Sequence, residues 1–297
     1  MKIIILGSGG CVSTPKPLCR CRVCVEARAK GHPYARYGAS IYVEDAALLI
    51  DTPEDIALAL NHADIQRIDQ IVYSHWDPDH TLGLRVMEQL RLEWLDYYEG
   101  KRPTSPLVVY AHPEVMADLN GIRSKFGSIL DYYEFMGLAV RREVAGAIAF
   151  DVVTDKLHDH RSLMVGPVKM TLLRVPKEKA VSVFVLEREG KKVIYSPCDC
   201  KPYPDSELFY DADALIMGNT VIGDVLKDGR PLTTDHPLRS ELHVLEDVLA
   251  MREKYRIKRL VMTHLEEDWG KGYDDYLELE KGLDNVQFAY DGMVIEI

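Results

Sequence analysis

Residues 74–83 read SHWDPDHTLG and directly follow an apolar run, IVY, of the kind that forms a buried β-strand. His75, Asp77 and Asp79 alternate along the chain, so their side chains can converge on one face of an extended backbone, and His80 begins the following turn. Imidazole and carboxylate groups are common ligands of divalent metal ions. The stretch therefore predicts a metal site at the end of a strand.

Short apolar runs recur along the chain and predict further β-strands. These runs are KIIILG, ASIYVEDAALLIDT, QIVYSH, PLVVYAH, VKMTLLRVP, AVSVFVLEREGKKVIYSPCD, ADALIMGN, RLVMTHL and NVQFAYDGMVIEI. Within them, SVFVLEREGKKVIYS predicts a hairpin whose turn is Glu189-Gly190-Lys191. Helical patterns lie between the strands, at Thr81 to about Tyr98, Pro113 to Lys125, Leu238 to Tyr255 and Tyr273 to Lys281.

Strands and helices alternate in both halves of the chain, and no repeat or flexible linker separates the halves. We therefore expect a single domain over residues 1–297, with a helical insertion at about 84–140. An α/β sandwich of two mixed sheets with helices outside accounts best for this order of elements. Composition alone leaves a doubly wound sheet open.

Composition and charge limit the classes of partner. The chain of 297 residues is 47% hydrophobic, which is enough for a substantial core, and has no uninterrupted apolar run long enough to cross a membrane. Its beginning, MKIIILGSGG, lacks the features of a signal peptide, so we expect a cytoplasmic location. The net charge of −11 favours a small-molecule substrate over long nucleic acids, and a homodimer stays open.

A cysteine cluster follows the first strand. Cys19, Cys21 and Cys24 form the spacing C-x-C-x2-C and lie too close together to pair usefully as disulfides. Three thiolates supply most of a tetrahedral zinc shell. We expect a structural zinc ion here, and the alternative is three free thiols packed as small apolar groups.

Further polar residues stand at the ends of other predicted strands. Asp199 ends the strand of the predicted hairpin, and His264 ends RLVMTH. Ligands delivered from several strand ends to one rim would form a site on a rigid scaffold. Asp51, at the end of LLIDT, either orients an imidazole from behind or forms a turn. Cys198 and Cys200 flank Asp199 and are either ligands or redox-active thiols, or they only alternate between core and rim.

The series His75-x-Asp77-x-Asp79-His80, followed by Asp199 and His264, resembles the metal motif of the metallo-β-lactamase fold family, an αββα sandwich. The segments LLIDT and GSGG upstream fit the same resemblance. More narrowly, C-x-C-x2-C after the first strand and the ending FAYDGMVIEI resemble the branch of PhnP-type cyclic phosphodiesterases and PqqB proteins.

The resemblance implies two adjacent metal positions. The first would be held by His75, residue 77 and a later histidine, and the second by Asp79, His80 and His264, with Asp199 bridging. This sequence departs from that pattern twice, because residue 77 is Asp and the later histidine is replaced by Lys177, or by Lys179 in a shifted alignment.

The two departures have two interpretations. A carboxylate and an ammonium group in these positions could form an ion pair in place of one cation, which leaves a single metal. Alternatively, Asp77 ligates a hard metal such as iron or manganese while Lys177 contacts the substrate. We therefore expect one or two divalent ions of Zn, Mn or Fe.

The resemblance also implies a reaction. A bound cation lowers the pKa of water and polarises a phosphoryl oxygen, which predicts a metal-dependent phosphodiesterase for a small phosphorylated or cyclic phosphate substrate. The predicted catalytic residues are Asp79, Lys177 and His236. His236 precedes a helix and resembles by its location a non-ligand histidine that contacts phosphate or protonates the leaving group, with His243 as the alternative. The alternative functions are a PqqB-like, iron-dependent oxidative enzyme and a non-catalytic metal-binding protein.

By the same resemblance, the fourth ligand of the cysteine site would lie three residues after His264, where this chain has Glu267. Zinc accepts carboxylate oxygen, so a shell of three cysteines and one glutamate is chemically feasible. Asp268 and a more distant cysteine are the alternatives.

Overall fold

Two large β-sheets form the framework of the computed structural model, which describes residues 1–125, 127–144, 148–151 and 156–297. The first sheet has the order β19 (Val294–Glu296), β1 (Lys2–Gly7), β2 (Ser40–Val43), β3 (Leu48–Ile50), β4 (Gln70–Tyr73), β5 (Leu107–Ala111) and β8 (Ala139–Glu143). The second has the order β18 (Val286–Phe288), β17 (Leu260–Thr263), β14 (Ala214–Gly218), β13 (Lys191–Ser196), β12 (Ser182–Arg188), β11 (Val168–Arg174), β10 (Lys156–Val165) and β9 (Ile148–Asp151).

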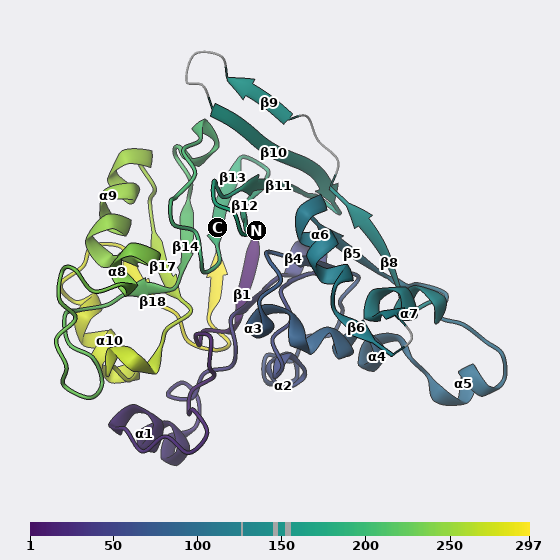
Figure 1. Cartoon of the computed structure of the whole chain (residues 1–297), viewed down its shortest axis with the longest axis horizontal. Coiled ribbons are helices and arrows are strands. Elements are labelled where there is room, and N and C mark those ends of the chain that lie inside the picture. The colour runs from purple at the N-terminus through teal and green to yellow at the C-terminus, as the bar shows by residue number, and fades with distance from the viewer. Residues whose placement is uncertain (126, 145–147, 152–155) are drawn as a thin grey trace.

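Helices cover the outer faces of both sheets, as Figure 1 shows. Beside the first sheet lie α2 (Ile56–His62), α3 (Pro78–Thr81), α4 (Val86–Arg91), α5 (Trp94–Tyr98), α6 (Pro113–Asn120) and α7 (Ile129–Phe135). Beside the second lie α8 (Leu238–Glu241), α9 (Leu245–Tyr255) and α10 (Tyr273–Glu280), and α1 (Arg22–Lys30) lies at one end of the molecule. The expected αββα sandwich is thus confirmed.

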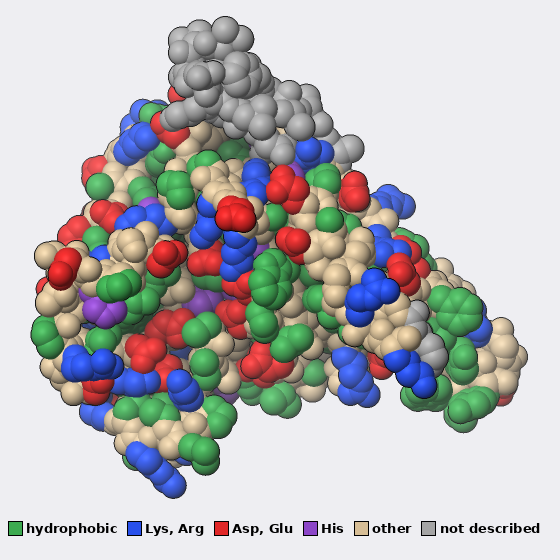
Figure 2. Space-filling model, viewed as in Figure 1, with side chains coloured by type: hydrophobic (Ala, Val, Ile, Leu, Met, Phe, Trp, Pro, Cys, Tyr) green, Lys and Arg blue, Asp and Glu red, His purple; other side chains and the backbone are tan. Residues whose placement is uncertain are grey.

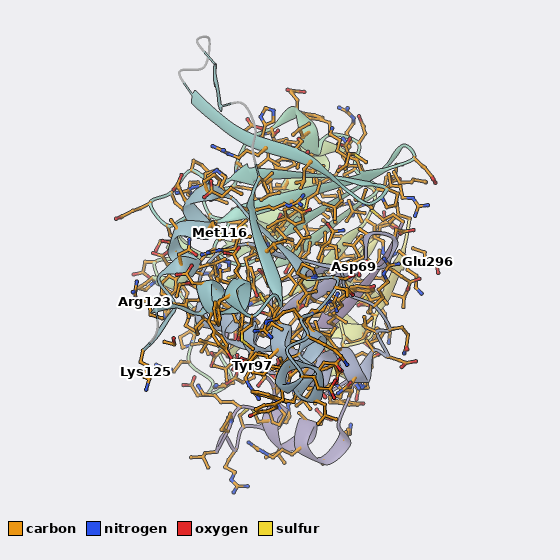
Figure 3. All side chains as sticks on the ribbon, turned by 90° about the vertical axis from the view of Figure 1, so that its right-hand side faces the viewer. Asp69, Tyr97, Met116, Arg123, Lys125 and Glu296 are labelled. Carbon is orange, nitrogen blue, oxygen red and sulfur yellow. The ribbon has the colours of Figure 1, made fainter. Side chains whose placement is uncertain are left out.

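The remaining elements are short. They are the 3-10 turns η1 (Glu44–Ala46), η2 (Leu82–Arg85), η3 (Glu207–Phe209) and η4 (Glu267–Trp269), and the two-residue strands β6 (Arg123–Ser124), β7 (Gly127–Ser128), β15 (Thr220–Val221) and β16 (His243–Val244). In a view turned by 90°, Arg123 of β6 lies toward one side of the molecule and Glu296 of the edge strand β19 toward the other (Figure 3).

Strand alternation explains how the layers are held together. In β1, Ile3 and Ile5 point into the core between the two sheets, whereas Ile4 and Leu6 point to the core under the helices of the first sheet. Because successive side chains leave a strand on opposite faces, a run that is apolar throughout fills two cores at once. This is why the strands in the middle of both sheets read as nearly continuous apolar runs.

The hairpin of β12 and β13 has the expected position and a tighter turn. Arg188 pairs directly with Lys191, so the loop contains only Glu189 and Gly190. Their φ angles of 51° and 75° lie in the left-handed region. A two-residue turn of this kind matches the twist of the flanking strands.

The prediction of one continuous helix from Thr81 to about Tyr98 is wrong. The chain forms the separate elements α3, η2, α4 and α5 in this region. Gly83 lies so close to the loop after β3 that a Cβ atom there would be 2.0 Å from the Pro53 carbonyl oxygen. Leu92 has an extended backbone, with φ −92° and ψ 113°, and packs against the core of the first sheet. Tertiary packing therefore overrides the helical pattern.

The region of residues 84–140 contains more than the expected helices. It also contributes β5 and β8, which extend the first sheet beyond β4. In β5, Leu107, Val109 and Ala111 are fully buried. Similarly, the pattern from Leu238 to Tyr255 is interrupted by β16, which pairs with β15.

Within the described ranges, none of the helices has the length and apolar character needed to cross a membrane.

Candidate metal centre

Four strands deliver polar side chains to one rim of the sandwich. Asp51 follows β3, His75 follows β4, Cys198 follows β13 and His264 follows β17. Strand β3 is parallel to β4, and β13, β14 and β17 are parallel to one another. The carboxyl ends of parallel strands meet at the same edge of a sheet, so side chains far apart in sequence come together there. Figure 2 shows acidic and histidine side chains in the middle of this face, between the two halves of the molecule.

The backbone is sharply turned at three of these strand ends. Asp51, Asp199 and His264 have φ angles of 64°, 60° and 55°. Such left-handed conformations cost residues other than glycine about 1–3 kcal/mol each and persist where the surrounding structure enforces them. At this rim, the left-handed backbone turns the chain directly after strands β3 and β17 and within the loop after β13.

The largest group of candidate ligand atoms among the described residues comes from Asp79, His80, Cys198 and His264. One ligand atom from each of these residues lies within 4.8 Å of all the others. The Cys198 sulfur lies 3.3 Å from Nε2 of His80, and Asp79 Oδ2 lies 3.5 Å from the same nitrogen. Asp79 Oδ2 is also 3.4 Å from Nε2 of His264. A thiolate, a carboxylate and imidazoles at this spacing form a donor set that suits zinc.

A second, smaller group adjoins the first and shares its thiol. It consists of His75, Asp77 and Cys198. His75 Nε2 is 3.3 Å from the Cys198 sulfur and 3.4 Å from Asp77 Oδ2. The sulfur of Cys198 therefore stands between two neighbouring positions at which a cation could be held.

Asp51 and Ser74 orient two of the imidazoles from behind. The Asp51 carboxylate accepts a hydrogen bond from His80 Nδ1 at 2.8 Å and another from the Ser74 hydroxyl at 2.6 Å. Because the Ser74 hydroxyl donates its proton to Asp51, it accepts from His75 Nδ1, 2.8 Å away. Because Nδ1 of each ring makes these contacts, Nε2 of His75 and of His80 faces the cluster, where it offers a lone pair to a cation when the ring is neutral. Asp51 thus contacts an imidazole from behind, which is one of the two roles expected from its place in LLIDT, and its left-handed backbone also forms the turn.

His264 tests whether the cluster fits a metal ion. Its side chain is 1% exposed, and among the described residues neither ring nitrogen has a hydrogen-bond partner. A buried polar group without a partner costs about 1–3 kcal/mol. A metal ion bound by His264 Nε2 would satisfy this nitrogen, while Glu266 Oε1 lies 3.4 Å from Nδ1 on the other side of the ring. The donors present therefore fit a metal ligand set.

The electrostatics of the cluster favour an ionised thiol. Burial by itself raises the pKa of Cys198, but the positive charges of His75, His80 and His264 together lower that pKa well below the ordinary thiol value. Burial also opposes protonation of His80 and His264, and the charge on Cys198 nevertheless raises the pKa of each ring. The thiolate is the form of cysteine that binds metal ions.

A chain of ion pairs lies beside the cluster. The Lys179 ammonium group contacts Asp77 Oδ2 and also lies 2.6 Å from Asp199 Oδ2. Lys177 contacts only the main chain here, with its ammonium 3.2 Å from the Asp199 carbonyl oxygen. Of the two alignments considered from the sequence, the structure therefore places Lys179 beside Asp77.

The structure adds contacts for two residues whose predicted roles stay predictions. The carboxylate of Asp199, which the resemblance implies as a bridging ligand, is paired with Lys179, and the Cys198 sulfur lies between the imidazoles of His75 and His80. The backbone of Asp199 is left-handed, with φ 60°, and at this turn the Cys198 sulfur faces the imidazoles while the Asp199 carboxylate faces Lys179. Lys179, the alternative in the shifted alignment, contacts Asp77, whereas Lys177 contacts a main-chain carbonyl oxygen. Ser74 and Glu266 were not predicted at all, although Ser74 directly precedes the motif.

The predicted general acid lies apart from these contacts. His236 is half-buried in the loop before α8, where its Nδ1 accepts a hydrogen bond of 3.2 Å from the Leu238 amide. His243 is buried behind Cys200, with Nε2 3.4 Å from the Cys200 carbonyl oxygen. The structure describes no contact between either histidine and the ligand cluster.

The cysteine cluster forms a separate group. The thiols of Cys19, Cys21 and Cys24 come within 4.8 Å of one another at the start of α1. Glu267 is not a member of this group, and its buried carboxylate is 2.8 Å from the Lys227 ammonium. Burial raises the pKa of the Cys24 thiol to about 12, which is a cost that a bound cation would offset.

We predict that Cys21→Ser loses zinc from this cluster and unfolds at a lower temperature, because a tetrahedral thiolate shell contributes directly to folding. Glu267→Ala should retain the zinc, since Lys227 holds the Glu267 carboxylate. Zinc content by plasma mass spectrometry and the midpoint of thermal unfolding measure both effects. Unchanged zinc in Cys21→Ser would reject the site, whereas loss of zinc from Glu267→Ala would restore Glu267 as the fourth ligand.

Comparisons with known proteins identify relatives of this fold. The model of the beta-lactamase superfamily domain matches residues 47–265. A diphosphatase from the PhnP family has a similar solved structure, with 20% identity, a TM-score of 0.69 and a match that covers 100% of this chain and 96% of that one. Zn²⁺-bound PqqB from Methylobacterium extorquens also has 20% identity and a TM-score of 0.69, over 100% of both chains.

The short form of human tRNase Z has 17% identity and a TM-score of 0.62, over 100% of this chain and 99% of that one. At these identities the three structures establish a shared fold. No curated protein matches this chain in sequence.

Proposed function

This chain belongs to the beta-lactamase superfamily, and from that premise we propose that it is a metal-dependent hydrolase, and more specifically a phosphodiesterase, that acts on a small phosphorylated or cyclic phosphate substrate. The observation that carries the proposal is the buried group of Asp79, His80, Cys198 and His264, whose ligand atoms all lie within 4.8 Å of one another. The superfamily is one of hydrolases, and a fold relative from the PhnP family is a diphosphatase.

The donor set supports zinc as the ion at this position. Asp79, His80, Cys198 and His264 would hold it, since soft thiolate together with imidazole favours zinc over manganese. When bound, a divalent ion supplies the Lewis acidity and the activation of water that hydrolysis needs. Asp51 and Ser74 fix the orientation of the His75 and His80 rings. These imidazoles can therefore bind an ion without rearrangement.

The chain's own charges support an anionic substrate. The Lys179 ammonium lies at the rim beside Asp77 and Asp199, and Lys177 is half-exposed on the same loop. A positive charge fixed near the reacting phosphoryl group stabilises the negative charge that develops there. Lys177 keeps its proposed role as a contact for the substrate, because its ammonium group is bound only to a carbonyl oxygen among the contacts described.

A groove of about 700 Å³ beside this rim supports a small substrate. It is lined by Trp76, Lys177 and Lys179 on one side and by Glu114, Ala117 and Asp118 of α6 on the other. The volume is in the range of small-molecule sites. The indole of Trp76 is 43% exposed, and the Lys179 ammonium lies 5.9 Å from its ring centre, so a planar group could stack beside a cation.

An assay of metal-stripped and reconstituted protein tests this function. We expect purified protein to hydrolyse bis(p-nitrophenyl) phosphate or a cyclic nucleotide, to lose at least about 100-fold of that activity after chelation, and to recover it with Zn²⁺. Tightly bound iron in anaerobically purified protein, without phosphodiester turnover, would favour the oxidative alternative. Tightly bound metal without hydrolysis of any phosphodiester would contradict the proposal.

A further inference from the structure

The two ligand groups at the rim differ in what surrounds them. Asp79, His80, Cys198 and His264 form a group without a lysine among them, whereas the smaller group of His75, Asp77 and Cys198 has an ammonium group on one of its ligand oxygens. That oxygen, Asp77 Oδ2, is the one that faces His75 Nε2 at 3.4 Å. Lys179 therefore binds the same atom that a cation in the smaller group would need.

We propose that Lys179 takes the place of a second metal ion, so that this site holds one metal and carries its other positive charge on the protein. The inference rests on the proposed metal centre and specifies its stoichiometry. A zinc ion binds carboxylate oxygen at about 2.0–2.2 Å, so an ion on Asp77 Oδ2 would share a single oxygen with the ammonium group. Two positive charges at that separation repel each other strongly in a partly buried site.

The ammonium group is held on both sides. Lys179 contacts Asp77 and lies 2.6 Å from Asp199 Oδ2, and the three side chains are only 20–25% exposed. Both contacts join oppositely charged groups, so the ammonium group and the two carboxylates balance one another's charge in a partly buried place. Lys179 bridges two carboxylates, which is a role that a divalent cation plays in other sites.

The loop that carries Lys179 is fixed at its backbone. The Arg174 guanidinium donates to the carbonyl oxygens of Val175 and Lys179, the second at 3.0 Å, and is itself paired with Glu114 at 2.9 Å. The Val175 amide bonds to the Val181 carbonyl oxygen at 2.9 Å and closes the loop. These bonds hold the loop in the conformation that places Lys179 beside the two carboxylates.

Removing the charge should open the second position. The test variant is Lys179→Met, which keeps most of the side-chain volume. The first control, Lys179→Arg, retains the charge. The second control, Lys177→Met, removes a charge from the same loop, but the ammonium group of Lys177 contacts a carbonyl oxygen and not a carboxylate. All proteins are reconstituted with Zn²⁺, passed through a desalting column and analysed for zinc content, and crystals are examined by anomalous diffraction at the zinc edge.

We expect one zinc ion at the rim in the natural protein, in Lys179→Arg and in Lys177→Met. In Lys179→Met we expect one further equivalent and a second anomalous peak between His75 and Asp77, roughly 3.5–4 Å from the first, as in two-metal sites. Zinc in the cysteine cluster is the internal reference, because it should be equal in all four proteins.

Two outcomes would overturn the inference while leaving the proposed hydrolase intact. One is a natural protein with two equally occupied zinc ions at the rim, and the other is Lys179→Met with a single ion there. A rim without zinc in any of the four proteins would instead overturn the proposed metal centre, and with it the role of Lys179.

Discussion

His264→Ala is expected to abolish zinc binding at the rim and to lower hydrolysis to the level of the metal-free protein. His264 is the ligand that comes from β17, and its removal leaves Asp79 and Cys198 with fewer donors around a shared cation. Loss of residues that only orient a metal ligand already costs about 10–100-fold in affinity, so loss of a ligand should cost at least about 100-fold. Zinc content after desalting and competition with a chromophoric chelator measure the effect.

The fold should survive this substitution. The His264 ring has no hydrogen-bond partner among the described residues, so alanine leaves no donor or acceptor newly unpaired. The matched control is His243→Ala, because His243 is also a buried histidine at the end of a loop and lies behind Cys200. The control should retain rim zinc. If His264→Ala also lost zinc from Cys19, Cys21 and Cys24, the two metal sites would not be independent.

Cys198→Ser is expected to have the second largest effect, because it replaces the one thiolate of the rim by a hydroxyl group that stays protonated near neutral pH. We expect zinc affinity to fall by at least about 100-fold, with a parallel loss of hydrolysis. The exchange changes one atom and little volume, so a loss of zinc would reflect the ligand and not the packing. Isothermal titration of metal-free protein with Zn²⁺ provides the affinity.

Variants of two residues that follow Cys198 serve as controls for this experiment. Cys200→Ser changes a buried thiol that donates to the carbonyl oxygens of Pro197 and Cys198, away from the imidazoles. Asp199→Asn removes the charge of one of the two carboxylates that contact Lys179 and leaves the four residues of the ligand group unchanged. Both should keep zinc at the rim. If Asp199→Asn lost the ion and Cys198→Ser kept it, Asp199 and not Cys198 would be the ligand supplied by β13.

The sequence by itself determined those features that depend on short-range periodicity. Strands such as β1 and β14 were predictable because a run that fills cores on both faces is apolar at every position. His75, Asp79 and His80 could be grouped as ligands because they lie in one turn after a strand. His264 could be added because parallel strands end at a common rim.

Only the tertiary structure decided which of several adjacent residues faces the site. Cys198 and Asp199 are equally good candidates by composition, and the left-handed φ of 60° at Asp199 is part of the turn that leaves Cys198 among the imidazoles. Lys177 and Lys179 are two residues apart on one loop. Hydrogen bonds from the Arg174 guanidinium to main-chain oxygens help to fix the path of this loop, in which Lys179 contacts Asp77. The path of a loop is set by contacts with segments distant in sequence, so no local pattern encodes it.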